Sequence, residues 1–184
     1  MGADKALLRL GGQTLIELAI GSFSGFSEIL VSAADTERYA FTNVTIVPDE
    51  RPGIGPIGGI ISVLKAAASP LVCFRPVDAP LVPSALHPLL AAACAGRDAA
   101  APVYEGKAEP LLACFAKTAL PVLEGLAQSG NFKIADAFPL LNCEFVQLDS
   151  PELLTLLGDP SAWLVNANDT DVFSRLALRQ ESPD

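Results

Sequence analysis

The chain has 184 residues, of which 51% are apolar and only 18% are charged, and its formal net charge is −9. That length suits one domain spanning residues 1–184, and so apolar a composition excludes a disordered chain. The acidic balance argues against a protein that grips the phosphate backbone of DNA or RNA. Any phosphate must therefore be bound locally, by backbone amides, a few basic side chains or a metal ion.

Short apolar runs typical of strands alternate with helical patterns along the chain. The predicted strands span residues 29–32, 44–47, 71–74, 99–103, 111–115, 144–148 and 163–165. The predicted helices span residues 14–23, 57–67, 84–95, 118–128, 131–138, 151–156 and 170–178. This alternation predicts an α/β fold of βαβ units with a mostly parallel sheet. The strands are continuous apolar runs, so we expect helices to cover both faces of the sheet.

Several kinds of site are excluded by residue type. His87 is the only histidine, which rules out a two-histidine metal site and disfavours a Ser-His-Asp triad. The four cysteines are widely spaced in apolar stretches, so we expect buried thiols in a reducing compartment and a cytoplasmic protein. Residues 79–96 are uncharged, but three prolines interrupt them and no signal peptide is visible, so no membrane segment is predicted.

A carboxylate follows the strand predicted at residues 71–74. In open α/β sheets, ligands bind at the carboxyl ends of the strands. Asp78 lies between Pro76 and Pro80, which fix the backbone and hence the direction of the carboxylate. Such a position suits Mg²⁺, which binds one or two carboxylates together with substrate phosphates. An aspartate that only caps a turn or helix is the alternative.

A glycine-rich segment follows the strand predicted at residues 44–47. Asp49 precedes four glycines between residues 53 and 59, and these lead into a predicted helix. Glycine lets the backbone approach a ligand closely, and a helix N-terminus offers free amides. The spacing matches neither a Walker loop nor the Gly-x-Gly-x-x-Gly pattern, and a plain flexible loop is the alternative.

Two further segments carry weaker signals. Lys5 could reach a phosphate as a point charge, although a solvated lysine is the alternative. Asn166 and Asn168 end the last predicted strand, where their amide oxygens could serve a metal ion or its water shell. Capping of the helix that follows is the alternative for these asparagines.

Taken together and in order, these segments resemble the molybdenum cofactor guanylyltransferase family of nucleotidyltransferases. The matching pieces, in chain order, are Met1-Gly-Ala-Asp-Lys-Ala-Leu-Leu, Asp49, Gly55-Pro-Ile-Gly-Gly, Pro76-Val-Asp-Ala-Pro and Val165-Asn-Ala-Asn-Asp, and Glu109-Pro-Leu also resembles a family segment. The resemblance covers nearly the whole chain and implies a three-layer, Rossmann-like nucleotidyltransferase fold with a mixed, mostly parallel sheet. It also implies transfer of GMP from GTP to the molybdenum-pterin cofactor, with release of pyrophosphate.

The resemblance further implies a role for individual residues. Asp78 would hold Mg²⁺ and, with Lys5, act in catalysis. The residues implied in nucleotide binding are Lys5, Ser32, Asp49 and Asp78, and those implied near the second substrate or the metal are Asn166 and Asn168. The attacking group would be a phosphate of the pterin, which is already anionic, so no histidine base is needed. The implied partners are GTP, the pterin cofactor, and molybdoenzymes or other cofactor-synthesis proteins.

Two departures from the family pattern matter. Ser32 stands where an asparagine is usual, and its shorter reach leaves the choice between GTP and CTP open. The family also begins with a strand and a glycine-rich, arginine-containing loop that would precede Met1. Either the native chain extends upstream of Met1, or the chain has no such strand and loop and is then expected to show a gap or rearranged pairing in the sheet and weak or absent GTP binding. The alternatives are a cytidylyl- or sugar-phosphate nucleotidyltransferase and a catalytically inactive relative that binds the cofactor or a partner.

Overall fold

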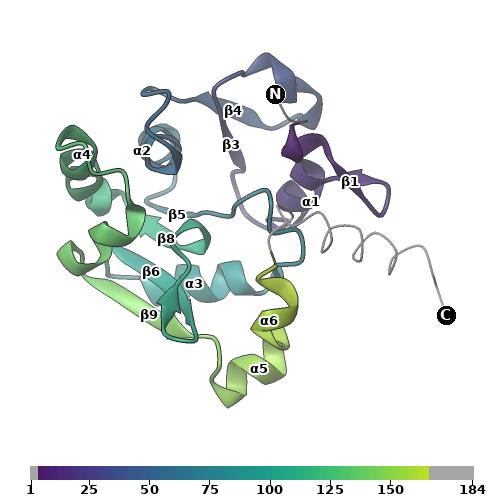
Figure 1. Cartoon of the computed structure of the whole chain (residues 1–184), viewed down its shortest axis with the longest axis vertical. Helices are drawn as coiled ribbons and strands as arrows, with labels where there is room; N and C mark the ends of the chain where they lie inside the picture. Colours follow the sequence, from purple (N-terminus) through teal and green to yellow (C-terminus); the bar gives the residue numbers. More distant parts are fainter. Residues whose placement is uncertain (1–3, 166–184) are drawn as a thin grey trace.

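The amino-terminal part of the chain folds around one short helix. The computed structural model describes residues 4–165 (Figure 1). The elements here are the 3₁₀ helix η1 (Lys5–Leu7), the hairpin of β1 (Arg9–Leu10) and β2 (Gln13–Thr14), and helix α1 (Leu15–Gly21). A capping box starts α1, because Thr14 and Glu17 each accept a backbone N–H from the other. Leu10 and Leu15 form a small core with Val77 and Leu81.

A two-stranded parallel sheet follows. It consists of β3 (Leu30–Ala33) and β4 (Thr45–Pro48), which are connected through the 3₁₀ helix η2 (Glu37–Thr42). Both strands are the apolar runs expected from the sequence. The register pairs Ser32 with Val47 and Ala33 with Pro48, so the carboxyl ends of the two strands lie at the same edge.

Helix α2 (Pro56–Ala66) connects β4 to a second, five-stranded sheet. The strands of this sheet are β5 (Leu71–Cys73), β8 (Cys114–Ala116), β6 (Ala99–Tyr104), β7 (Lys107–Ala108) and β9 (Cys143–Gln147). Strand β8 is antiparallel to its neighbours β5 and β6, whereas β9 is parallel to β6. The strands β5, β6 and β9 therefore run in one direction, and the expected mixed α/β sheet is confirmed.

Helices cover this sheet on both faces. One core contains α2, α4 (Leu120–Gln128) and the 3₁₀ helix η5 (Ile134–Leu140), and the 3₁₀ helix η4 (Lys117–Ala119) leads into α4. The other core contains α3 (Leu86–Cys94), α5 (Pro151–Leu157) and α6 (Pro160–Trp163). Along β6, Ala99 and Ala101 belong to the first core and Ala100 to the second. Because alternate residues face opposite sides, the sheet is the middle of three layers.

The sheet is interrupted between β3 and β5 (Figure 1). Within the described chain, β3 pairs only with β4, and β5 pairs only with β8. Helix α2 packs against β3 and β4 and against α4, and so ties the two sheets together. This interruption agrees with the gap or rearranged pairing that the sequence analysis expects in the sheet.

Two of the predicted strands are wrong in whole or in part. Residues 111–115 were expected to form one strand, but Pro110–Leu112 is the 3₁₀ helix η3 and β8 begins only at Cys114. Pro110 has no N–H for a sheet and its fixed φ favours a helical turn. Residues 163–165 were expected to form a strand, but Trp163 ends α6, which Asp159 caps by accepting the N–H of Ser161.

One predicted helix has a different form, and another lies beyond the described residues. Residues 131–138 were expected to be α-helical, but Ile134–Leu140 is a 3₁₀ helix with Pro139 inside it, which cannot donate the helical hydrogen bond. The helix predicted at residues 170–178 lies outside the described residues.

None of the helices within residues 4–165 is long and apolar enough to cross a membrane. All four cysteines are free, and Cys94 and Cys114 are buried as expected, whereas the other two are half-buried.

Candidate functional site

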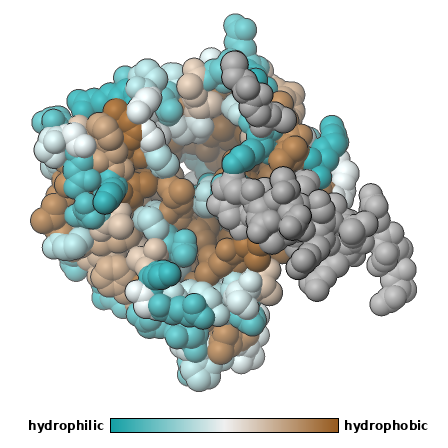
Figure 2. Space-filling model, in the orientation of Figure 1, coloured by the Kyte–Doolittle hydropathy of each residue, from teal (hydrophilic) through white to brown (hydrophobic). Residues whose placement is uncertain are grey.

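A cavity of about 960 Å³ opens between β3, the amino end of α2 and β5. In Figure 2, apolar side chains surround a hollow near the centre of the face shown. The cavity reaches the carboxyl ends of β3, β4 and β5, where ligands bind in open α/β sheets. Three residues predicted from the sequence line it: Ser32, Asp49 and Asp78.

Ser32 and Asp49 form a hydrogen-bonded pair on one side of the cavity. Ser32 Oγ donates to Asp49 Oδ1 over 2.5 Å. The register of β3 and β4 explains this contact, because Ser32 lies opposite Val47 and Asp49 follows soon after. Helix α2 packs closely on the pair at Gly59, where an added Cβ would lie 2.6 Å from Ser32 Oγ and 3.4 Å from Asp49 Oδ1. A glycine at this position therefore allows the helix to lie directly against both side chains.

The glycine segment also lines the cavity. Gly53 has a φ of +88° and Gly55 a φ of +75°, which are values that residues with a Cβ rarely adopt. Gly55 is the N-cap of α2 and has no side chain to cap it, and Pro56 takes the first helical position. The backbone N–H groups of the first turn are consequently not occupied by a capping side chain.

Asp78 lies on the turn that follows β5, and Arg75 closes this turn. The guanidinium of Arg75 donates from Nη2 to the carbonyl oxygen of Ala79 over 2.7 Å. Its Nε is buried and has no hydrogen-bond partner in the structure of residues 4–165. Burial lowers the pKa of Arg75 to about 10, which still leaves it a cation at neutral pH. A carboxylate and a cation from one turn thus line the cavity together.

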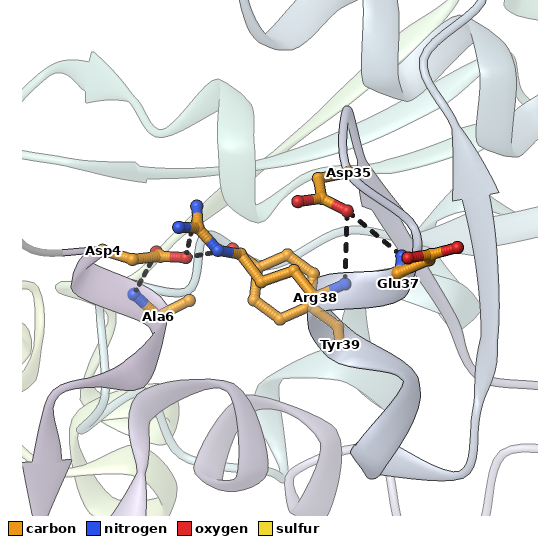
Figure 3. A network of polar contacts seen from close by, with 6 residues as sticks. All are labelled: Asp4, Ala6, Asp35, Glu37, Arg38 and Tyr39. Atoms are coloured by element: carbon orange, nitrogen blue, oxygen red, sulfur yellow. Dashed lines mark hydrogen bonds and ion pairs between the residues drawn. The ribbon is translucent and has the colours of Figure 1, made fainter.

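Arg38 and Tyr39, which line the cavity, bind the amino-terminal segment (Figure 3). The hydroxyl of Tyr39 donates to Asp4 Oδ2 over 2.8 Å, and Arg38 Nη1 lies 3.2 Å from the same oxygen. Burial, together with the Asp4 carboxylate, raises the pKa of Tyr39 to about 12, so the phenol remains a donor. Asp35 holds the start of η2 by accepting two backbone N–H groups.

The other predicted site residues are not brought to the cavity by the described structure. Lys5 is exposed and does not line the cavity, although its neighbour Ala6 does. Asn166 and Asn168 lie outside the described residues. The proposed contact of Lys5 with phosphate, and the role of the two asparagines, therefore remain predictions.

The cavity residues that the sequence reasoning missed include Arg38, Tyr39 and Arg75. Arg38 and Tyr39 follow the strand predicted at residues 29–32, so the rule that ligands bind at strand ends points to them as well. Arg75 directly precedes the Pro76 motif, but no local pattern distinguishes a guanidinium that lines a cavity from one that is solvated.

Comparison with known proteins agrees with the fold and identifies the family. Residues 1–140 match the family model of the MobA-like NTP transferase domain. The chain is 31% identical over 177 residues to the probable molybdenum cofactor guanylyltransferase of Carboxydothermus hydrogenoformans, covering 96% of this chain and 88% of the relative. It is also similar to the solved structure of molybdopterin-guanine dinucleotide biosynthesis protein A from Archaeoglobus fulgidus. That match has a TM-score of 0.79 at 25% identity and covers 96% of this chain and 90% of the other.

A more distant solved structure shares the fold alone. It is the 2-C-methyl-D-erythritol 4-phosphate cytidylyltransferase from Thermus thermophilus, with a TM-score of 0.63 at 20% identity, covering 86% of this chain and 94% of the other. The expected nucleotidyltransferase fold is therefore shared with this more distant structure. Sequence and fold together show that the chain belongs to the MobA-like NTP transferase family, a family of nucleotidyltransferases.

Proposed function

We propose that the protein transfers GMP from GTP to the molybdenum-pterin cofactor, with Mg²⁺ as the metal and pyrophosphate as the second product. The observation that carries this proposal is the single cavity that collects Ser32, Asp49 and Asp78 at neighbouring strand ends. The names of the relatives support guanylyl as the transferred group and molybdenum cofactor biosynthesis as the pathway.

The chemistry needs positioning and charge neutralisation more than a covalent nucleophile. A phosphate oxygen of the pterin attacks the α-phosphorus of GTP. The bond from that phosphorus to the oxygen bridging the α- and β-phosphates breaks, and pyrophosphate leaves with this oxygen. Because the attacking phosphate is already anionic, no side chain has to take up a proton. His87 is fully buried and does not line the cavity, in keeping with this requirement.

The net negative charge of the cavity lining supports the need for a divalent cation that accompanies the nucleotide. Four acidic side chains (Glu28, Asp35, Asp49 and Asp78) and two basic ones (Arg38 and Arg75) line the cavity. A triphosphate would be repelled there unless additional positive charge accompanied it.

The donor set fits Mg²⁺ carried by the nucleotide. No cluster of three or more His, Cys, Asp or Glu side chains in the described part of the chain could hold a metal by itself. Mg²⁺ is commonly bound by one or two carboxylates plus substrate phosphates, and Asp78, with Asp49 on the same cavity, supplies such carboxylates. Bound in this way, Mg²⁺ would neutralise charge on the phosphate oxygens. Asp78 would hold it, and Arg38 and Arg75 would add positive charge at the cavity wall.

Asp49 gives a physical reason to favour guanine. The base offers two N–H donors, N1–H and the amino group, on one edge, whereas cytosine offers only its amino group there. A carboxylate has two acceptor oxygens and can take both guanine donors. Since Ser32 already donates to Asp49 Oδ1, the pair is oriented before the base binds.

The test is turnover of labelled GTP with Mg²⁺ and the pterin acceptor. Asp78→Asn should lower the rate by about 10²–10³-fold, as expected on loss of a group that stabilises charge in the transition state. Asp149→Asn is the control, because Asp149 is exposed and does not line the cavity. Full activity in a correctly folded Asp78→Asn protein would remove this residue from the metal role.

A panel of nucleotides and acceptors separates this proposal from its alternatives. A clear preference for CTP, or for a sugar phosphate as acceptor, would identify a related nucleotidyltransferase, which Ser32 in place of the usual asparagine leaves open. Binding of the pterin without any turnover would identify an inactive relative. The proposed product would pass to molybdoenzymes or other cofactor-synthesis proteins in the cytoplasm, where the four free thiols would stay reduced.

A further inference from the structure

Three of the four thiols gather on one face of the five-stranded sheet. Cys73 lies on β5, Cys114 on β8 and Cys94 on α3, and all three pack in the core that contains this helix (Figure 1). Cys143 packs in the core on the opposite face of the sheet. The fold therefore concentrates oxidisable sulfur at one place, which the proposed function does not use.

Cys73 and Cys114 lie directly opposite each other on antiparallel strands. Phe74, the next residue along β5, donates its N–H to the carbonyl oxygen of Ala113, the residue before Cys114. Hydrogen-bonded and non-hydrogen-bonded pairs alternate along an antiparallel ladder, so the two cysteines form a non-hydrogen-bonded pair. In such a pair the Cα atoms lie about 4.5 Å apart and the two side chains point to the same face of the sheet.

This spacing suits a disulfide, which usually joins residues whose Cα atoms lie about 4.4–6.8 Å apart. Hydrogen bonds with the thiols of Cys73 and Cys94, together with burial, raise the pKa of Cys114, so these sulfur atoms are close neighbours. Helix α3 orients two of the thiols. Cys73 Sγ donates to the carbonyl oxygen of His87 over 3.4 Å. Cys94 Sγ lies 3.7 Å from the carbonyl oxygen of Cys114.

We propose that Cys73 and Cys114 form a reversible oxidation site, at which hydrogen peroxide converts the two thiols into a cross-strand disulfide. Because Cys73 is half-buried, whereas Cys114 is buried, Cys73 is the thiol that peroxide reaches first. Its sulfur attacks one peroxide oxygen, so that an S–O bond forms and the O–O bond breaks. The other oxygen leaves as water with the thiol proton. The sulfur is oxidised to a sulfenic acid, and the peroxide is reduced.

The opposite thiol completes the reaction. The sulfur of Cys114 attacks the sulfur of the sulfenic acid, so that the S–S bond forms and the S–O bond breaks. The departing hydroxyl takes the proton of Cys114 and leaves as a second water molecule. An added dithiol reverses the reaction by exchange, because its own two thiols are oxidised to a disulfide while the two cysteines are reduced.

The test treats the whole folded chain with hydrogen peroxide and maps its thiols by mass spectrometry. The expected product is lighter by two hydrogen atoms, contains a linked Cys73–Cys114 peptide pair, and returns to the starting mass with dithiothreitol. A link between any other pair overturns the proposal. Sulfinic acid at Cys73 without a link overturns it as well, and so does a link that forms only after urea unfolds the protein.

Single substitutions separate the roles of the thiols. Cys114→Ala should abolish the link and leave Cys73 as a sulfenic acid that dimedone labels. Cys143→Ala is the matched control, because this half-buried residue packs on the other face, and the link should form as before. Cys94→Ala should also keep the link, and its loss in either of these two variants contradicts the assignment. If Cys114→Ala does not fold, as judged by circular dichroism, the peptide map of the unmodified chain decides.

The melting temperature tests whether the link fits the two strands. A disulfide here closes a loop of roughly 40 residues and should raise the Tm of the oxidised protein by several degrees, because it restricts the unfolded chain. A lower Tm than that of the reduced protein would mean that the strands must distort, and would contradict the geometry on which the proposal rests. No nucleotide enters these experiments, so their outcome is independent of the proposed function.

Discussion

Replacing Gly59 by alanine tests how closely α2 packs on the Ser32–Asp49 pair. The new Cβ would lie 2.6 Å from Ser32 Oγ, a separation that real Cβ contacts essentially never show. Ser32 is exposed, so its hydroxyl can rotate away. The expected consequence is loss of its hydrogen bond to Asp49, with the fold retained.

Two opposing contributions set the magnitude. Alanine in place of a helical glycine raises the free energy of unfolding by about 0.5–1 kcal/mol. Loss of a hydrogen bond to a charged group lowers it by about 1.5–3 kcal/mol, and the exposure of Ser32 favours the lower end. Gly59→Ala should therefore destabilise the protein by about 0.5–1 kcal/mol, the difference between these contributions.

Gly125→Ala is the matched control. Gly125 lies in helix α4, and an added Cβ there would have no atom within 4 Å, so this variant should be stabilised by about 0.5–1 kcal/mol. Urea unfolding followed by circular dichroism should separate the two variants by about 1–2 kcal/mol. In a Ser32→Ala background, Gly59→Ala should destabilise less than in the native chain, because the contact with Ser32 Oγ is gone while the Cβ of residue 32 remains 3.3 Å away. Equal stabilisation by Gly59→Ala and Gly125→Ala would refute the close packing of α2 on Ser32.

Three other predictions follow from the polar groups. Burial, with Arg75 acting in the same direction, lowers the pKa of His87 from 6.5 to about 4. The unfolded chain binds the proton first as the pH falls, so stability should decline between pH 6.5 and 4. His87→Phe should remove up to about 1.4 kcal/mol per pH unit of that decline, as measured by urea unfolding across this pH range. If the slope of the unfolding free energy against pH were the same in the variant, the imidazole of His87 would not be buried and neutral. Tyr39→Phe should lower the free energy of unfolding by about 0.5–1.5 kcal/mol and abolish a phenol that ionises near pH 12 in an ultraviolet titration. Asp49→Asn should raise KM for GTP about tenfold with little change for CTP, because one acceptor oxygen for the guanine donors is lost, and an equal effect on both nucleotides would exclude base recognition by Asp49.

Most elements could be predicted because local patterns decide them. The apolar runs of β3, β4 and β5 and the periodic faces of α2 and α4 are strong signals, and their bounds agree with the structure to within a few residues. The errors occur where proline changes the local backbone, as at Pro110 and Pro139. Strand direction was harder to predict, because the reversal of β8 between β5 and β6 depends on long-range pairing.

The candidate site was predictable only in part. Ser32, Asp49 and Asp78 could be found because strand ends meet at one edge of a sheet. The burial of Arg75 and the contact of Tyr39 with Asp4 depend on how distant segments pack, which no local pattern encodes. The resemblance to guanylyltransferases supplied the reaction itself, since the residue types alone left a turn, a cap or a flexible loop open at each motif.

The unequal distribution of the apolar cores has a consequence for cooperativity. Both large cores draw their residues from position 54 onward, whereas the earlier part of the chain contributes the small core of Leu10 and Leu15. Local unfolding is opposed mainly by buried apolar contacts, so the segment before α2 should form the less stable folding unit. Ser32 and Asp49 belong to that unit, and Asp78 belongs to the other. A ligand that contacts all three would bind across the boundary, and part of its binding free energy would stabilise the weaker unit against opening.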